Sequence, residues 1–236
     1  VFVNRVWQFH FGEGLVRSVD DFGRQGDQPT HPELLDYLAV TFQEKGWDLK
    51  WLTREIMMSQ VYRQSSAEIA ECLAKDPSAK LLWRKPPLRL EAETIRDSML
   101  RVSGLLNTKM FGRQEPLKRG ADGQWVEDDG KGNPNRRSLY MQQSRTRPIA
   151  FLHAFAAPTM TADNQTQRFR SALPSQSLAL LNNPLLLRTT KAFAEQVLEQ
   201  SRGNVDEALR QAVTAAYTRP PTARELAIGK SAVEAG

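Results

Sequence analysis

The sequence predicts a mainly α-helical domain, a multi-helix bundle-like fold with a minor short β element and one long irregular insertion. Three observations lead to this fold class. Apolar residues recur at three- and four-residue spacing in several segments, as on the buried face of a helix. Alternation of apolar and polar residues, which is typical of half-buried strands, is poor throughout the chain. No repeat of 20–50 residues occurs, which excludes a solenoid.

The composition indicates a folded globular protein and excludes several classes. The chain has 236 residues, of which 40% are hydrophobic and 25% charged, with a net charge of +5. This length supports a hydrophobic core without disulfides or metals. The single cysteine, Cys72, excludes an intrachain disulfide, a cysteine-based zinc site and a C-x-x-C-H haem attachment. No apolar run reaches the roughly 18 residues of a transmembrane helix.

The first helix is expected over residues 1–10. Val3, Val6 and Trp7 fall on one face at helical spacing, and Gly12 provides the positive φ that often ends a helix. Because the helical pattern is present from the first residue, we expect the chain to be cut from a longer polypeptide.

Two further helices are expected before residue 66. Thr30 and Glu33 have the spacing of a capping box at the start of a helix with a buried stripe over 34–42. Asp48 is a good N-cap for the next helix, over 49–61. Helices joined by such a short turn are usually antiparallel neighbours.

The middle of the chain contains the strongest helical pattern and the least regular segment. Residues 90–106 predict an amphipathic helix whose charged residues, Arg96 among them, face solvent. Residues 107–135 are rich in Gly, Asp and Lys, and they predict an irregular insertion in which a short hairpin is one option. Residues 136–143 are the best strand candidate.

The C-terminal part is expected to be helical. Helices are predicted in 149–156, 174–181 and 185–200, and two more begin at the cap pairs Asn204 with Glu207 and Thr222 with Glu225. We therefore expect one compact domain in three parts: N-terminal helices over 1–106, the insertion over 107–135, and a strand with C-terminal helices over 136–236.

A series of short blocks runs along nearly the whole chain: Asn4-Arg5-x-Trp7, Phe11-Gly12-x-Gly14, His31-Pro32-Glu33-Leu34-Leu35, Tyr62-Arg63-Gln64-Ser65-Ser66, Arg89-Leu90-Glu91-Ala92-Glu93, Asn135-Arg136-Arg137-Ser138-Leu139-Tyr140 and Pro174-Ser175-Gln176. The series resembles the domain of unknown function found near the C-terminus of large planctomycete proteins. Those proteins often carry a planctomycete-type cytochrome c domain upstream. The resemblance implies a non-catalytic or uncharacterised module of an exported protein, located in the periplasm, at the cell surface or outside the cell. It provides no catalytic residues.

Several polar residues are candidates for buried anchors. Asn4, Arg5 and Trp7 could frame a ligand pocket, but we favour a buried anchor against the helix that begins near His31. In that interpretation Arg5 pairs with a carboxylate such as Asp21 or Glu33. His31 suits the first turn of that helix.

Two carboxylates of the 90–106 helix, Glu93 and Asp97, share one face. They could hold a cation or exchange protons. Intrahelical ion pairs with neighbouring arginines are the favoured interpretation.

The most unusual stretch is 130–170, which holds seven basic residues and one acidic residue. Arg136, Arg137, Arg145 and Arg147 are the candidate anion-binding residues, because guanidinium groups make planar bidentate contacts with phosphate, sulfate or carboxylate. We expect one arginine of the adjacent pair Arg136 and Arg137 to face inward and pair with the Glu91, Glu93 or Asp97 carboxylate. The other should stay exposed to attract a polyanion.

The sequence thus predicts a structural or interaction module whose partners are other domains of the same polypeptide, an acidic polysaccharide or an acidic protein. The alternative is an enzyme or binding domain that acts on a polyanionic polysaccharide. Nucleic-acid binding is a second alternative, and the mild net charge argues against it. No phosphate-binding loop, nucleophile elbow or metal-ligand motif occurs, so we expect neither a metal nor a cofactor in this chain.

Overall fold

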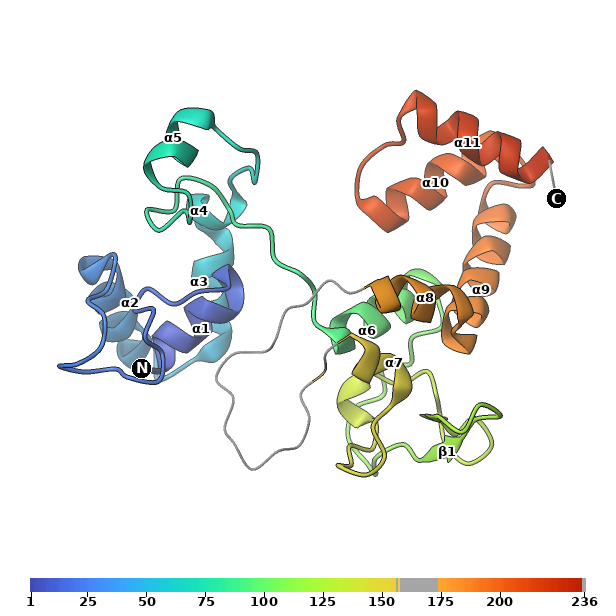
Figure 1. The fold of residues 1–236 in the computed structure, drawn as a ribbon, viewed down its shortest axis with the longest axis horizontal. Coiled ribbons are helices and arrows are strands. Elements are labelled where there is room, and N and C mark those ends of the chain that lie inside the picture. Colours follow the sequence, from blue (N-terminus) through green and yellow to red (C-terminus); the bar gives the residue numbers. More distant parts are fainter. Residues whose placement is uncertain (156, 158–173, 235–236) are drawn as a thin grey trace. The chain divides into compact units, whose positions relative to one another are not determined.

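The computed structural model describes residues 1–155, 157 and 174–234, and these form two compact units, Val1–Arg89 and Leu90–Gly236 (Figure 1). Helices dominate both units, and the described residues contain a single two-stranded antiparallel sheet. The predicted class, mainly α with a minor β element, is therefore confirmed. The domain boundaries predicted at residues 106 and 135 stay a prediction.

Unit 1 contains five helices: α1 (Phe2–Phe11), α2 (Pro32–Glu44), α3 (Leu49–Met58), α4 (Gln60–Arg63) and α5 (Ala70–Lys75). The first three pack together around one hydrophobic core (Figure 1). Its buried members are Val3, Val6, Trp7, Phe11, Leu15, Leu38, Phe42, Leu52 and Ile56. The helical spacing of these side chains is the reason that each helix forms with one face against the others.

Asn4 anchors the loop after α1. Its side-chain Nδ2 donates to the Val16 carbonyl oxygen at 2.9 Å, and the Val16 N–H donates to Asn4 Oδ1 at 2.9 Å. A Cβ at Gly14 would lie 2.5 Å from Asn4 Nδ2, so the close approach requires glycine there. Trp7 is also buried and stacks on Phe11, with 4.2 Å between ring centroids.

Arg5 does not share this burial, and the prediction of a buried Arg5 ion pair is wrong. Its side chain is exposed, and no ion pair of Arg5 occurs in the part of the chain that the structure describes. The reason is helical geometry. Asn4 and Trp7 lie three residues apart on the core face, whereas Arg5 is turned about 100° from Asn4.

Replacing Asn4 by alanine is expected to lower the free energy of unfolding by about 2–3 kcal/mol, because both backbone groups of buried Val16 lose their hydrogen-bond partner. Urea denaturation of the whole chain measures the loss. Arg5→Ala, on the exposed face of the same helix, is the control and should change stability by less than about 0.5 kcal/mol. Equal stability of the Asn4 variant and the wild type would contradict the anchoring role.

Two of the helix-end predictions for unit 1 are confirmed and one is wrong. Gly12 ends α1 with φ 87°, and Asp48 Oδ1 accepts from the Lys50 and Trp51 backbone N–H groups, so both predictions are confirmed. The predicted capping box of Thr30 with Glu33 is wrong. His31 is the N-cap of α2 and makes no side-chain cap bond. The Thr30 hydroxyl instead donates to the Leu15 carbonyl oxygen, while His31 Nδ1 lies 3.0 Å from Thr30 Oγ1.

Unit 2 begins with α6 (Ala92–Val102), followed by β1 (Leu117–Arg119), β2 (Trp125–Glu127) and a 3₁₀ helix, η1 (Ser138–Tyr140). Its later helices are α7 (Ala150–Ala154), α8 (Pro174–Asn182), α9 (Pro184–Gln200), α10 (Val205–Tyr217) and α11 (Ala223–Glu234). The buried core joins α6, α7 and α9 through Ala92, Leu100, Met141, Ile149, Phe151, Leu152, Phe155 and Leu185.

The insertion contains the short hairpin that the sequence left open: β1 and β2 pair in antiparallel register, with Arg119 opposite Trp125. The strand predicted over 136–143 is wrong, since η1 occupies its centre. In a strand, Leu139 and Met141 would point to the same face. Here Leu139 is 72% exposed and Met141 is 3% exposed, because the chain turns between them.

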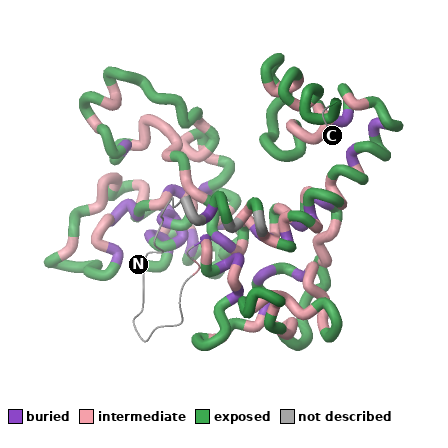
Figure 2. Tube along the Cα trace, turned by 45° about the vertical axis from the view of Figure 1, so that its right-hand side comes forward, coloured by how far each residue is buried: buried purple, intermediate pink, exposed green. Residues whose placement is uncertain are grey.

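The N-terminal caps of α10 and α11 are formed by residues close to each other in the sequence. Asn204 Oδ1 accepts from the Glu207 N–H, and Thr222 and Glu225 cap each other reciprocally, as predicted. The Arg219 guanidinium, together with hydrogen bonds from Thr222, lowers the pKa of Glu225 to about 2. Figure 2 shows α10 and α11 largely as exposed or intermediate, and of their described residues only Ala208, on α10, is buried.

Candidate functional site

Arg96 is the centre of the insertion's attachment to α6. Its side chain is fully buried, and Nε donates to Glu127 Oε1 at 2.7 Å. Nη1 donates to the carbonyl oxygen of Arg136 at 2.9 Å and lies 3.3 Å from Ser138 Oγ. Nη2 donates to the Pro134 carbonyl oxygen at 2.5 Å. The prediction that Arg96 faces solvent is therefore wrong, because the insertion folds over this face of α6.

Asp97 holds the turn that replaces the predicted strand. Its Oδ1 accepts from both the backbone N–H and the hydroxyl of Ser138, each at 2.7 Å. Asp97 Oδ2 lies 4.0 Å from Arg137 Nε. Asp97 therefore fixes the start of η1 as well as pairing with an arginine. Glu93, one turn earlier, contributes its backbone carbonyl to the Ser138 hydroxyl at 3.4 Å.

Arg136 is the second buried arginine, at 4% exposure. Nη1 donates to Glu115 Oε1 at 2.9 Å and to the Arg113 carbonyl oxygen at 3.1 Å. Nη2 donates to the carbonyl oxygens of Lys109 and Phe111 at 3.1 and 2.8 Å. One guanidinium thus gathers four acceptors from a seven-residue stretch, a task that its planar set of donors suits.

Glu115 completes this attachment. Its Oε2 accepts from the Asn133 N–H at 2.7 Å. Burial alone would raise the pKa of Glu115, but the Asn133 hydrogen bond and the Arg136 guanidinium hold that pKa below its usual value. The Arg136 guanidinium also lies 3.9 Å from the centroid of the Tyr140 ring. The Glu115 carboxylate is therefore ionised at neutral pH, and each of its two oxygens accepts a hydrogen bond.

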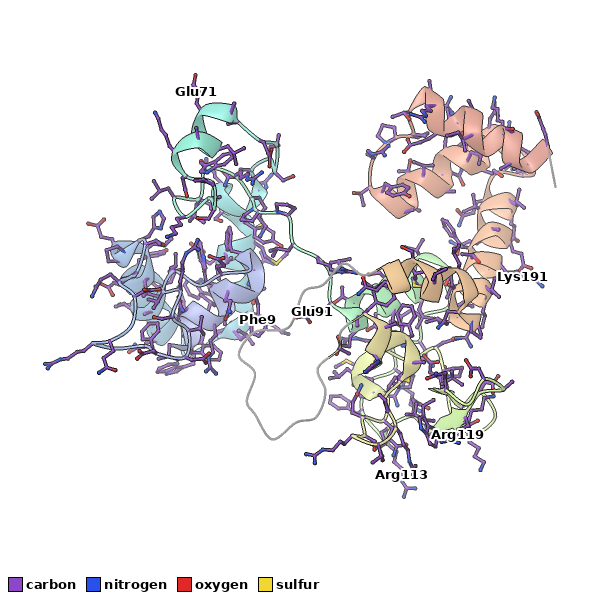
Figure 3. All side chains as sticks on the ribbon, in the orientation of Figure 1. Phe9, Glu71, Glu91, Arg113, Arg119 and Lys191 are labelled. Carbon is purple, nitrogen blue, oxygen red and sulfur yellow. The ribbon has the colours of Figure 1, made fainter. Side chains whose placement is uncertain are left out.

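The buried arginines Arg96 and Arg136 pair with two carboxylates of the insertion, Glu127 and Glu115. Three arginines of the same region remain exposed and make no ion pair with any residue that the structure describes; we term them the outer arginines, Arg113, Arg119 and Arg147. Figure 3 labels Arg113 and Arg119 at the outer edge of this part of unit 2. The arrangement leaves positive charge on the surface.

Two of the outer arginines meet on one indole. The Arg119 guanidinium lies 5.6 Å, and the Arg147 guanidinium 5.2 Å, from the centroid of the Trp125 ring. The hairpin register places Arg119 opposite Trp125, and a bridge between Trp125 and Ile149 brings Arg147 to the same ring. Exposed contacts of this kind are worth about 0.5–1 kcal/mol each, so both guanidinium groups favour a position beside the indole.

The structure separates the four arginines that the sequence grouped together. Arg136 is buried and cannot belong to an anion-binding face, which corrects that prediction. It is the inward arginine that we expected, but its partner is Glu115 rather than the Glu91–Asp97 region. Arg137 has a 46% exposed side chain near Asp97, and Arg145 and Arg147 are exposed. Arg168 and Arg170, in the same basic stretch, lie outside the described residues.

Arg119 and Trp125 were not predicted as site residues. Both fall in the insertion, where the sequence offered no periodicity to place them. The available signal was the run Leu117-Lys118-Arg119 followed, after the glycine turn, by Trp125-Val126, which fits a hairpin with a cation opposite an aromatic residue.

No group of three or more His, Cys, Asp or Glu side chains among the described residues is arranged to hold a metal ion. His10 and His31 contact protein oxygens, and His153 lies on the exposed side of α7. In the same part of the chain, no helix is long and apolar enough to cross a bilayer.

Comparison with known proteins gives one match. A family model described as PSD1, a protein of unknown function (DUF1553), matches residues 1–233. No curated protein and no solved structure is similar enough to match. The match extends over nearly the whole chain and confirms the resemblance to a domain of unknown function. The chain therefore belongs to the PSD1 (DUF1553) family of proteins of unknown function.

Proposed function

We propose that this chain is an interaction module that binds an acidic polysaccharide through the outer arginines Arg113, Arg119 and Arg147. The observation that supports this function is the convergence of two guanidinium groups on Trp125, neither of them paired with a described carboxylate. On the family resemblance alone, we also propose that the protein is exported.

The chemistry of the surface favours a polymer with sulfate or carboxylate groups. A guanidinium group donates two parallel hydrogen bonds to such an anion. Arg119 and Arg147 are ordered by Trp125, so less conformational entropy is lost on binding than for free lysines. A polymer engages several such groups at once, which turns individually weak contacts into measurable affinity. The partly exposed Trp125 ring adds an apolar surface for a sugar ring.

Titration with dextran sulfate, polygalacturonate and neutral dextran tests this function. The wild-type chain should bind the two acidic polymers and not neutral dextran. The double variant Arg119→Ala/Arg147→Ala should bind dextran sulfate at least about tenfold more weakly at about 50 mM salt, because two charge-assisted contacts are lost. Isothermal titration calorimetry measures the affinity of each chain for each polymer.

The control removes the same charge elsewhere in unit 2. Lys191→Ala/Arg210→Ala changes two exposed cations on α9 and α10, and it should alter the affinity by less than about twofold at that salt concentration. Equal weakening by both double variants would show that net charge alone attracts the polymer. Tighter binding of duplex DNA than of either acidic polysaccharide, persisting at about 200 mM salt, would favour a nucleic-acid-binding protein instead.

A further inference from the structure

A lysine in unit 1 is held among aromatic rings. The Lys85 Nζ lies 3.9 Å from the centroid of the Tyr62 ring and 4.1 Å from that of Phe11. The same nitrogen donates a hydrogen bond to the His10 carbonyl oxygen. The backbone is fixed as well, because the Lys85 N–H donates to the Ser65 carbonyl oxygen at 3.2 Å. The amine therefore has a defined position at the junction of α1 and α4.

No carboxylate pairs with Lys85 in the part of the chain that the structure describes. Its remaining N–H bonds face aromatic rings, which attract a cation but cannot accept strong hydrogen bonds. Burial lowers the pKa of Lys85 to about 8. At pH 7 this pKa gives about 300 times more neutral amine than a lysine of ordinary pKa would have.

Two titratable side chains belong to residues that contact the amine: Tyr62 through its ring, and His10, whose backbone carbonyl oxygen accepts the hydrogen bond. His10, on α1, donates from Nδ1 to the Val6 carbonyl oxygen at 2.7 Å, so the neutral imidazole carries its lone pair on Nε2. Its ring centroid lies 5.9 Å from that of Tyr62, on α4. Neither side chain is a carboxylate, so neither forms an ion pair with the ammonium form of Lys85.

We propose that Lys85 is a covalent attachment site for aldehydes, which it binds as an imine. The lone pair of the neutral Nζ attacks the carbonyl carbon, and a carbon–nitrogen double bond replaces the carbon–oxygen double bond. Both hydrogens of the neutral amine leave with the carbonyl oxygen as one molecule of water. No oxidant or reductant takes part in this step.

The aromatic surroundings favour an imine over an amide at this position. A protonated imine keeps its positive charge between the Tyr62 and Phe11 rings, so the cation–π attraction of the free ammonium group is retained. An amide is neutral and would lose that attraction. The rings also provide an apolar surface for an aromatic aldehyde. Nucleophilic lysines that form Schiff bases are typically desolvated in the same manner.

Reductive trapping with benzaldehyde and sodium cyanoborohydride at pH 7 tests the site in the whole chain. Peptide mass spectrometry then gives the rate of benzylation at each lysine. Lys85 should be labelled at least about tenfold faster than the exposed Lys75 and Lys80 of the same unit. This factor is smaller than the ratio of about 300 between the neutral fraction of Lys85 and that of a lysine with an ordinary pKa. Labelling of Lys85 at or below the rate of these two lysines would overturn the proposal.

Two further measurements test whether the aromatic surroundings of Lys85, and not its accessibility alone, cause its reactivity. In Tyr62→Leu, which removes one ring, the rate at Lys85 should fall toward that of Lys80. If that variant fails to fold, the pH profile of the wild type serves instead. The rate at Lys85 should reach half its maximum near pH 8, whereas the rate at Lys80 should keep rising above that pH. Parallel profiles for the two lysines would contradict an imine-forming site.

Discussion

Replacing Arg96 by methionine is expected to lower the free energy of unfolding by about 3–5 kcal/mol, the usual cost of removing one partner from a buried ion pair. The variant leaves the nearly buried Glu127 without its cation. It also leaves the Pro134 and Arg136 carbonyl oxygens without their donors, which methionine cannot replace. Urea denaturation followed by circular dichroism measures the loss.

Two comparisons assign this loss to the buried pair. Arg101→Met, on the exposed side of the same helix, should change stability by less than about 0.5 kcal/mol. The double variant Arg96→Met/Glu127→Gln should recover part of the stability that Arg96→Met loses, because the orphaned charge is gone. A double variant no more stable than Arg96→Met would show that the charge of Glu127 is not the cause.

Arg136→Ala should cost a similar amount, about 3–5 kcal/mol, since it strips four acceptors of their donor and orphans Glu115. Arg136→Lys should recover little of this stability, because an ammonium group cannot reach four acceptors spread around a planar guanidinium. Thermal and urea unfolding of both variants provide the measurement.

Arg137→Ala is the matched control, since it changes the neighbouring but exposed arginine and should cost less than about 1 kcal/mol. Glu115 adds a pH test. Its pKa is lower in the folded chain than in the unfolded chain, so its stabilising effect is present at neutral pH and is lost as acid protonates it. Arg136→Ala should reduce this part of the acid sensitivity. Equal costs for Arg136→Ala and Arg137→Ala would contradict the assignment of Arg136 as the inward arginine.

The parts of the fold that depend on neighbouring residues could be predicted from the sequence. Asp48, Asn204 and the pair Thr222 and Glu225 cap helices because each contacts backbone groups only two or three residues away. The helical periodicity of α1, α2 and α3 likewise identified their core faces. At Thr30 a competing bond to the Leu15 carbonyl, 15 residues away, displaced the local cap.

The candidate site depends on contacts that local patterns do not contain. Arg96 finds its partners 31 to 42 residues further along the chain, so the helical pattern could only assign it to the polar side. Arg136 and Arg137 were correctly divided into one inward and one outward side chain. The carboxylate that pairs with Arg136 was missed, because Glu115 lies in the insertion without any regular pattern. Arg119 and Trp125 were missed for the same reason, since they also lie in the insertion.

The ordering of the insertion by Arg96 and Arg136 is tested most directly by amide hydrogen exchange over residues 107–142. Backbone bonds from Asn107 to Asn135, from Glu115 to Tyr140 and from Gln142 to Glu115 close this segment. In the wild type these three amides should be protected to a degree comparable with amides of α6. In Arg136→Ala the protection of Glu115 and Gln142 should be lost while that of α6 remains. Rapid exchange of these amides in the wild type, at the rate of an unfolded chain, would contradict an insertion held in place by buried arginines.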